Sequence, residues 1–282
     1  MMKVTFVGIG AIGLPMALQV QNAGHSVTGV DLSSHARDVA RASGLDAVGL
    51  FDAAPAAEVV VAMVATPAQL ASLIDGVSEA VAGQRWIIMS TVGPVSVREQ
   101  GARLREAGAR VVDAPVTGGV ARARTGELVI FAAGNQDDIS ALRPVLDAMG
   151  SVRVTGENLG DGQSIKVVNQ HLCSVHIVAA AEALHLASSL GLEPAAVLEL
   201  IEKGAAGSWM LSDRGPRMLA GTDVNVTSAI NIFVKDSDLV AAAAEGCGAD
   251  VPLLAVANTR YHQAADAGLG TRDDSRVIET WR

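Results

Sequence analysis

Short apolar runs alternate with longer mixed segments through the first half of the chain. Most runs are followed closely by glycine, proline or a polar residue, which is typical of a strand that ends in a loop. Strands that are apolar along their whole length are buried on both faces, so the pattern predicts a parallel sheet covered by helices. The predicted strands are Lys3–Val7, Ser26–Val30, Val59–Val64, Trp86–Met89, Arg110–Val112 and Leu128–Ala132.

The pattern changes to a helical one near Gly160. Apolar residues recur at helical spacing from Gln163 to about Leu190, where Gly191 is expected to end a long helix. Later helices are expected at Ala195–Lys203, Ile230–Glu245 and Leu253–Ala265. We therefore predict an α/β Rossmann N-terminal domain over residues 1–160, followed by an all-α C-terminal domain over residues 161–282.

Composition and charge exclude several classes of protein. Half of the 282 residues are hydrophobic and 3% are aromatic, so aliphatic side chains and alanine must fill the core. The formal net charge of −9 is the opposite of a basic nucleic-acid footprint. Two distant cysteines, Cys173 and Cys247, form no disulfide framework, so we expect a cytoplasmic protein. We recognise no signal peptide and no run of the ~18 apolar residues that a membrane span requires.

A dinucleotide fingerprint lies between the first strand and a predicted helix, Ala11–Ala23. The first glycine permits a tight turn, the second lets the backbone approach a pyrophosphate, and the third lets the helix pack on the sheet. The helix N-terminus offers N–H groups and partial positive charge to the phosphates. The candidate residues are Gly8, Ile9, Gly10, Ala11, Ile12 and Gly13.

An acidic residue at the end of the second strand supports this interpretation. Asp31 follows Gly13 by 18 residues, close to the spacing at which a carboxylate accepts hydrogen bonds from the adenosine ribose. Because a carboxylate repels a 2′-phosphate, we expect NAD as the cofactor and regard NADP as the weaker alternative. A glycine turn with an unrelated surface aspartate remains the competing interpretation.

Polar residues also follow two further strands, where ligands collect in open α/β sheets. Ala65 and Thr66 precede Pro67, and Thr91 follows Ser90. We expect Ala65, Thr66 and Thr91 to line the nicotinamide half of the cofactor. A simple loop or helix cap would produce the same residues.

Three more motifs follow in order. The segment Asp113–Gly119 follows a predicted strand, Gly160–Gln170 opens the long helix, and Ile232–Asp236 lies on a later helix. Together with the fingerprint they resemble the β-hydroxyacid dehydrogenase family over the whole chain, down to Gly268–Glu279. The resemblance implies NAD-dependent oxidation of a small hydroxy acid that bears a carboxylate.

By this resemblance Lys166 is the catalytic lysine. Oxidation of an alcohol removes a hydride from carbon while the hydroxyl loses its proton, and a lysine can accept that proton when burial or a nearby cation lowers its pKa. Asn169 lies three residues further on and shares a helix face with Lys166, so it is expected to orient the lysine or bind the substrate. Taken alone, Lys166 would be interpreted first as a surface charge on a helix, as most lysines are.

The resemblance also implies a substrate loop and a cofactor lysine. Thr117, Gly118 and Gly119 would bind the substrate carboxylate, since glycines let backbone N–H groups converge on an anion. Lys235 would close over the cofactor, accompanied by Asp236. A solvated charge pair remains the alternative for these last two.

Three residues depart from the family pattern and affect the expected substrate, and two other segments resemble one subgroup. Ile12 stands where many members have Met, Gln170 where a second Asn is common, and Ser228 where several members have Phe. The segments Ser208–Met210 and Ser228–Asp236 resemble the four-carbon sugar-acid dehydrogenases, such as those acting on threonate.

Other functions remain open. His171, Cys173 and His176 do not match a zinc spacing, so no metal is expected. The alternatives are a semialdehyde or imine reductase of the same fold, or a non-catalytic dinucleotide-binding module. The family's lysine is retained at position 166, which argues against both imine reductases and a module that has lost catalysis. The long alanine-rich helix favours a homodimer or homotetramer.

Overall fold

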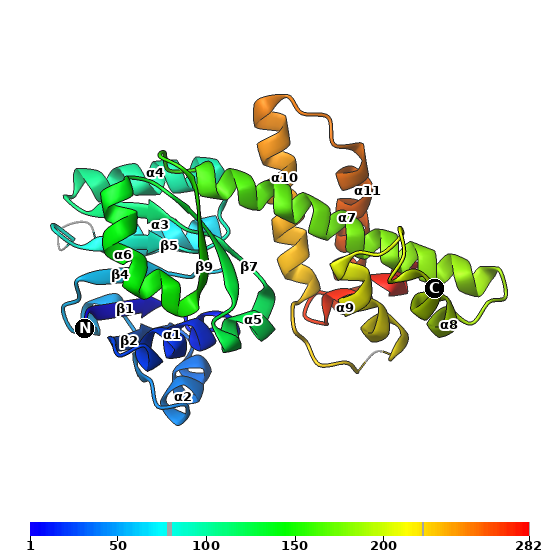
Figure 1. The fold of residues 1–282 in the computed structure, drawn as a ribbon, viewed down its shortest axis with the longest axis horizontal. Helices are drawn as coiled ribbons and strands as arrows, with labels where there is room; N and C mark the ends of the chain where they lie inside the picture. Colours follow the sequence, from blue (N-terminus) through cyan, green and yellow to red (C-terminus); the bar gives the residue numbers. More distant parts are fainter. Residues whose placement is uncertain (78–80, 222, 282) are drawn as a thin grey trace. The chain divides into compact units, whose positions relative to one another are not determined.

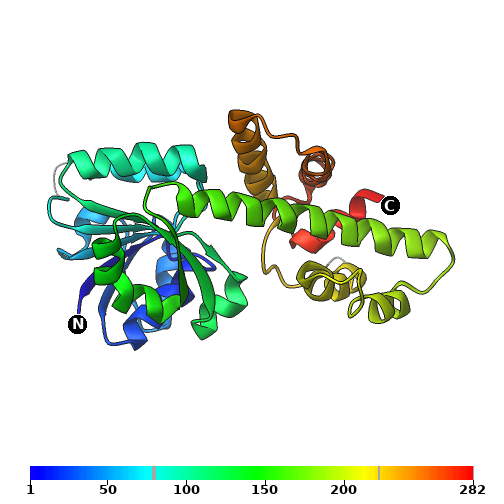
Figure 2. The same ribbon diagram turned by 45° about the horizontal axis from the view of Figure 1, so that its top comes forward.

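The computed structural model describes residues 1–77, 81–221 and 223–281. The described chain divides into two compact units, Met1–Lys166 and Val167–Arg282. The division falls within the first turns of one long helix, α7 (Asp161–Ser189), which Figures 1 and 2 show as continuous. The change of pattern near residue 160 therefore marks the start of α7.

The first unit is built on one sheet with the strand order β3-β2-β1-β4-β5-β6-β8-β7, and β9 pairs with β8. Strands β1 to β6 are mutually parallel, and their order 3-2-1-4-5-6 is that of the Rossmann fold. The predicted fold class is thus confirmed. The strands are β1 (Lys3–Val7), β2 (Ser26–Val30), β3 (Asp46–Val48), β4 (Val59–Ala62), β5 (Arg85–Ile88), β6 (Arg110–Asp113), β7 (Val116–Thr117), β8 (Leu128–Ala133) and β9 (Gly150–Gly156).

The sheet departs from the expected parallel arrangement beyond β6. Strand β8 pairs antiparallel with β6 through Asp113 and Ala133, and antiparallel with β7. An apolar run shows that a strand is buried but not in which direction it runs, so the sequence pattern could not predict this reversal.

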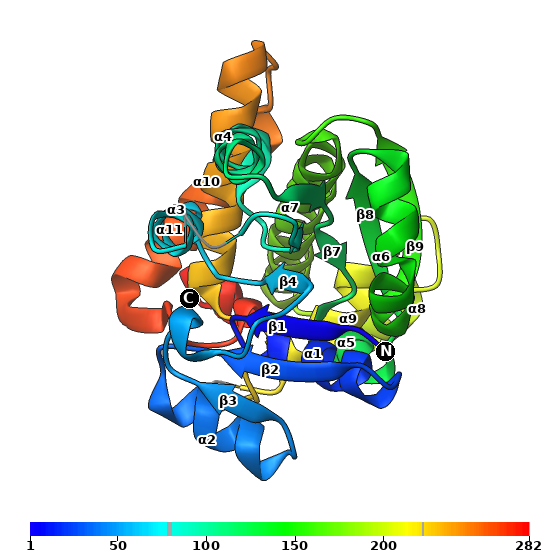
Figure 3. The ribbon, with the colours of Figure 1, turned by 90° about the vertical axis from the view of Figure 1, so that its left-hand side faces the viewer.

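Helices cover both faces of the sheet because successive strand residues point to opposite sides. In β4, Val59 and Val61 belong to one apolar cluster, whereas Val60 and Ala62 belong to the other. Figure 3 shows α1 and α6 on one side and α3 and α4 on the other. The helical elements are α1 (Gly13–Asn22), α2 (Ser34–Ala42), η1 (Phe51–Ala53), α3 (Pro67–Asp75), α4 (Gly93–Glu106), α5 (Gly119–Thr125) and α6 (Gln136–Met149).

The second unit is helical. Its core gathers residues of α7, α10 and α11, including Phe233 and Tyr261, whose rings stack with centroids 5.2 Å apart. Helices α10 and α11 run side by side (Figure 1). The elements are α8 (Pro194–Ile201), α9 (Trp209–Leu219), α10 (Ile230–Cys247), α11 (Pro252–Ala264), η2 (Ala265–Leu269) and η3 (Asp274–Trp281).

Helix α9 is absent from the sequence prediction, because Gly215 and Pro216 signal a helix break. The structure explains the glycine. A Cβ on Gly215 would lie 2.8 Å from Leu198 Cδ1, so glycine is what lets α9 approach α8 closely.

Two properties of the described residues concern membranes and metals. Helix α7 is long and apolar enough to cross a membrane by length and composition, a test that the core helix of a soluble protein also passes. No group of three His, Cys, Asp or Glu side chains in the described part of the chain is arranged to hold a metal ion.

Candidate functional site

The glycine loop after β1 has the backbone geometry that a bound dinucleotide needs. Gly8 has a φ of +88°, which favours glycine, and its N–H donates to the Val30 carbonyl at 2.8 Å. A side chain on Gly13 would collide with the Gly8 carbonyl. Gly10 is exposed, and a Cβ there would meet no described atom within 4 Å. This open backbone fits the close approach of a pyrophosphate.

The amino-terminal end of α1 is prepared for an anion. Its N-cap residue, Ile12, has an apolar side chain that cannot accept a hydrogen bond, and the first turn contains no acidic residue. Ala11 is exposed beside it, whereas Ile9 is buried in the core. The first N–H groups and the helix dipole therefore favour a phosphate at this end.

Asp31 is tied directly to the glycine loop. Its Oδ2 accepts a hydrogen bond from the Ile9 N–H at 3.1 Å, and its Oδ1 accepts one from the Ser33 N–H at 2.9 Å. Arg37, which the sequence analysis did not single out, donates to the carbonyls of Asp31 and Leu32 at 2.8 and 2.9 Å. The carboxylate is thus held beside the fingerprint on a braced loop, where a ribose hydroxyl would find an acceptor.

Thr66 caps helix α3. Its hydroxyl accepts from the Gln69 N–H at 3.1 Å, and Gln69 Oε1 accepts from the N–H groups of Ala65 and Thr66 at 2.8 and 3.2 Å. The cap shapes the loop at the carboxyl end of β4. Thr91 follows β5 at the same edge of the sheet, next to Ser90, whose hydroxyl donates to the Ala62 carbonyl at 3.2 Å.

The turn after β7 contains two glycines. Gly118 and Gly119 have φ values of +132° and +69°, a conformation that side chains disfavour. Thr117 ends β7 and is half-buried, and Gly119 is the first residue of α5. The loop therefore presents a hydroxyl beside the N-terminus of a short helix.

A buried hydrogen-bond network joins the end of β6 to α7. Asp113 is fully buried, and its Oδ2 accepts from the N–H groups of Gly160 and Gln163 at 3.1 and 2.9 Å. Its Oδ1 accepts from Gln163 Nε2 at 3.0 Å. A Cβ on Gly162 would lie 3.0 Å from Asp113 Oδ2, so glycine lets the first turn of α7 sit against this carboxylate.

The side-chain amide of Gln163 is saturated. Its Oε1 accepts from the N–H groups of Val92 and Gly93 at 3.1 and 3.0 Å. Its Nε2 donates to the Ser90 carbonyl at 2.9 Å as well as to Asp113. Two donated and two accepted bonds satisfy the main hydrogen-bonding positions of an amide. Gln163 thereby fastens α7 to the ends of β5 and β6 and to the start of α4.

Burial also changes the acidity of Asp113. Loss of solvation raises the pKa of this carboxyl to about 6, and the hydrogen bonds from Gln163 and Gly160 oppose that rise. Each hydrogen bond to the Asp113 carboxylate is donated by an N–H group of Gly160 or Gln163, so none of these bonds requires a proton on Asp113. It is therefore an anchor whose charge state changes in mildly acidic solution.

Lys166 lies one helical turn beyond Gln163, on α7. Its side chain is 7% exposed, which is unusual for lysine. The competing interpretation, a solvated surface lysine, does not fit this burial. The network around Gln163 sets where α7 starts and so where Lys166 lies.

The second unit holds the remaining predicted residues. Asn169 Nδ2 donates to Gln170 Oε1 at 2.8 Å, and Gln170 Nε2 donates to Asp236 Oδ2 at 2.5 Å. Lys235 Nζ pairs with Asp236 Oδ1 at 2.7 Å. Sequence analysis noted Gln170 only as a departure from the family pattern, because a contact between α7 and α10 leaves no local signal.

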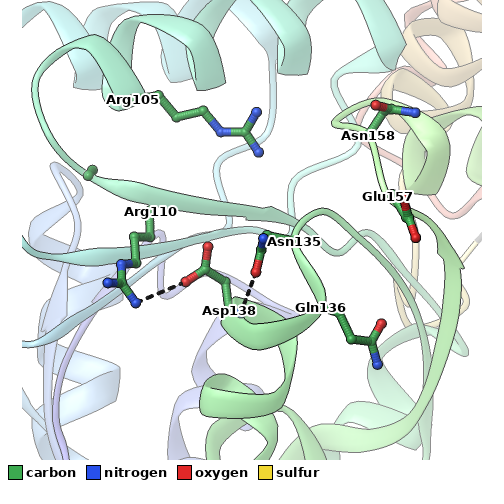
Figure 4. Close-up of a pocket in the computed structure, with 8 residues that line it drawn as sticks. Arg105, Arg110, Asn135, Gln136, Asp138, Glu157 and Asn158 are labelled. Carbon is green, nitrogen blue, oxygen red and sulfur yellow. Dashed lines mark hydrogen bonds and ion pairs between the residues drawn. The ribbon is translucent and has the colours of Figure 1, made fainter.

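A polar hollow of about 610 Å³ lies elsewhere on the first unit (Figure 4). Arg105, Arg110, Asp138 and Asn158 are among the residues that line it, and Arg110 pairs with Asp138 at 3.5 Å. Arg110 is the first residue of β6, so the hollow lies at the amino-terminal edge of the parallel strands. Ligands of open α/β sheets bind at the opposite edge, where Gly8 lies.

Predicted residues of the first unit lie together at the carboxyl ends of its parallel strands. In the second unit, a second set of predicted residues is connected by hydrogen bonds and an ion pair between α7 and α10. Arg37, Asp113 and Gln163 are functional candidates that sequence reasoning did not assign roles. A buried polar residue at a strand end was the available signal for Asp113. The first set comprises the fingerprint, Asp31, Ala65, Thr66 and Thr91, and the second comprises Asn169 and Lys235.

Comparison with known proteins gives matches over the whole chain. Residues 3–160 match the family model described as the NAD binding domain of 6-phosphogluconate dehydrogenase, and residues 160–281 match that described as NAD-binding of NADP-dependent 3-hydroxyisobutyrate dehydrogenase. The chain is 36% identical to L-threonate dehydrogenase of Cupriavidus necator, over 97% of this chain and 94% of that protein. It is 31% identical to the NAD-dependent L-serine dehydrogenase of Pseudomonas aeruginosa, over 98% and 97%. The crystal structure of 3-hydroxyisobutyrate dehydrogenase from Salmonella typhimurium gives a TM-score of 0.91 at 34% identity, over 99% of both chains.

Proposed function

The chain belongs to the β-hydroxyacid dehydrogenase family, whose members are NAD(P)-dependent oxidoreductases, and we propose that it oxidises a small hydroxy acid with Lys166 as the proton acceptor. The observation that carries the proposal is the buried Lys166, one turn beyond an amide that is saturated by the strand ends.

Each proposed role follows from the chemistry of the residue. Bound NAD⁺ supplies the hydride acceptor. Lys166 takes the hydroxyl proton as the carbon–hydrogen bond breaks and the carbonyl forms. Thr117, Gly118 and Gly119 bind the substrate carboxylate through a hydroxyl and N–H groups. Asn169 orients the substrate, and Lys235 assists cofactor binding.

The cofactor is NAD. Both matched family models are described as NAD-binding, and a relative 31% identical to this chain is named an NAD-dependent L-serine dehydrogenase. Asp31 supports NAD, because a carboxylate fixed beside the fingerprint accepts ribose hydroxyls and repels a 2′-phosphate.

The proposed substrate is a four-carbon sugar acid such as threonate. Relatives named L-threonate dehydrogenase are 33–36% identical to this chain over nearly its full length. A relative named for L-serine, at 31% identity, supports serine as the second candidate. Retention of Lys166 favours alcohol oxidation over imine reduction or a non-catalytic role.

We further propose a cytoplasmic homodimer or homotetramer. Helix α7 exposes large apolar side chains, among them Val168 at 62%, Leu172 at 49% and Leu186 at 55% exposure. Apolar side chains that recur along one helix favour contact with another copy of the chain. Light scattering on the purified protein would measure its mass.

A substrate panel tests the proposed function. Purified protein is mixed with NAD⁺ or NADP⁺ and with threonate, serine, 3-hydroxyisobutyrate, glycerate or a simple alcohol, and the reduced cofactor is followed by absorbance. We expect NADH with at least one hydroxy acid and none with the simple alcohol. Reduction of a semialdehyde or imine without oxidation of any hydroxy acid would favour the reductase alternative.

A further inference from the structure

A buried carboxylate on α10 sets the direction of a hydrogen-bond chain on α7. Asp236 is 4% exposed and pairs with the Lys235 ammonium at 2.7 Å. An ionised carboxylate offers acceptors and no donor. The Gln170 amide, 2.5 Å from Asp236 Oδ2, must therefore turn its NH₂ group toward Asp236.

The orientation of the Gln170 amide also fixes the orientation of the Asn169 amide. With Gln170 Nε2 on Asp236, Gln170 Oε1 faces Asn169 Nδ2 at 2.8 Å. The same Nδ2 lies 3.4 Å from Cys173 Sγ, a weak acceptor. An amide nitrogen carries two hydrogens, and both are directed at these two neighbours. Turning Asn169 over would set its carbonyl oxygen against Gln170 Oε1, where two acceptors repel.

The polar atom that Asn169 can offer to a ligand is therefore Oδ1, an acceptor. Asn169 is half-buried on α7 and lies three residues after Lys166, so the two share a helix face. An acceptor at this place attracts hydroxyl and ammonium groups and repels a carboxylate.

We propose that Asn169, held by Gln170 and Asp236, selects acids that carry a hydrogen-bond donor on the carbon next to the oxidised one. The proposal rests on the function proposed above and names its substrate class. Threonate presents a second hydroxyl there and serine an ammonium, whereas 3-hydroxyisobutyrate presents a methyl group. An acceptor at Asn169 disfavours binding of the substrate carboxylate by this residue.

The test compares acids that differ only by the hydroxyl group next to the oxidised carbon: glycerate and threonate, each with the deoxy analogue that keeps the hydroxyl being oxidised, such as 3-hydroxypropionate for glycerate oxidised at its third carbon. We expect kcat/KM for the better-hydroxylated acid to exceed that of its deoxy partner by at least about tenfold, since a site built to hydrogen-bond a hydroxyl rejects the analogue that lacks it. Asn169→Ala should bring the ratio close to one. Glu182→Ala, an exposed change on the same helix, should leave it unaltered.

A second variant and a binding measurement keep the proposal testable if Asn169→Ala folds poorly or turnover is slow. Gln170→Met removes the oxygen that orients Asn169 and should also lower the ratio. Calorimetry on the enzyme–NADH complex should give a lower Kd for glycerate than for 3-hydroxypropionate in wild type and equal values in Asn169→Ala.

The outcomes distinguish failure of the proposed dehydrogenase function from failure of the role proposed for Asn169. Absence of turnover with every acid refutes the proposed function. Turnover with equal use of both acids of a pair, an unchanged ratio in Asn169→Ala, or equal Kd values in wild type would overturn the role of Asn169 and leave the dehydrogenase assignment intact.

Discussion

Replacing Gln163 by leucine tests whether its amide holds the start of α7. The side chain is fully buried, and leucine has a similar volume but no polar atom. The change removes two acceptor contacts from the Val92 and Gly93 N–H groups and two donated bonds to Ser90 and Asp113. Three backbone groups and one carboxylate oxygen would then lose a buried partner.

The magnitude follows from those four groups. Leaving a buried donor or acceptor unsatisfied costs about 1–3 kcal/mol. Asp113 keeps its bonds from the Gly160 and Gln163 N–H groups, so its share is smaller. The three backbone groups alone give about 3–9 kcal/mol, so we expect Gln163→Leu to lower the free energy of unfolding by a large part of the 5–15 kcal/mol that stabilises a typical domain.

Urea unfolding measures this loss, with Gln136→Leu as a matched control because Gln136 is exposed. The control should change the free energy of unfolding by less than about 0.5 kcal/mol. Gln163→Glu adds a sharper comparison. It keeps both acceptors for Val92 and Gly93 but sets an oxygen against Asp113, so its loss should shrink in mildly acidic buffer, where one of the two carboxyls binds a proton. A cost below about 1 kcal/mol for Gln163→Leu, or no pH difference between the Leu and Glu variants, would refute the reasoning.

Three further predictions address the cofactor, the substrate loop and pH. Asp31→Ser should raise kcat/KM for NADP⁺ relative to NAD⁺. Asp38→Ser, which alters an exposed aspartate on α2, should leave this ratio unchanged. A wild type that prefers NADP⁺ would contradict the role of Asp31. Thr117→Ala should raise the substrate KM about 10–100-fold, the value of one hydrogen bond to a charged group, and Thr117→Ser should restore it, with the NADH Kd unchanged in both. For Asp113, the native pKa of about 6 exceeds the unperturbed 3.8, so the native state binds the proton more tightly. The unfolding free energy of wild type relative to Asp113→Asn should therefore fall by up to about 3 kcal/mol as pH rises from about 4 to 6, and a flat difference across that range would count against it.

The elements that sequence predicts well are those with local signals at their ends. Helix α10 ends where Gly248 adopts a φ of +70°, and α11 begins at Pro252, which suits a first helical turn. The fingerprint glycines were likewise predictable, because a positive φ at Gly8 and a close contact at Gly13 admit no side chain.

Features that depend on distant contacts were not predictable. Strand β9 has a mixed burial pattern, and its pairing with β8 is a long-range contact. Gln163 reads as one polar residue in a helical segment, and its importance appears only when Ser90, Val92 and Asp113 surround it. Lys166 is identified by the resemblance of its motif to a known family, because no local pattern indicates that its side chain is buried.

The most direct test of the account is the turnover of Lys166 variants with the best acid of the panel. We predict that Lys166→Ala folds and binds NADH with wild-type affinity but loses about 10²–10⁴-fold in kcat, the usual contribution of general acid–base catalysis. Lys166→Arg should not restore activity, because a guanidinium stays protonated and cannot accept the alcohol proton. Lys203→Ala, which alters an exposed lysine, should behave as wild type. Near-normal turnover by Lys166→Ala would contradict the proposed mechanism and leave only the dinucleotide-binding fold established.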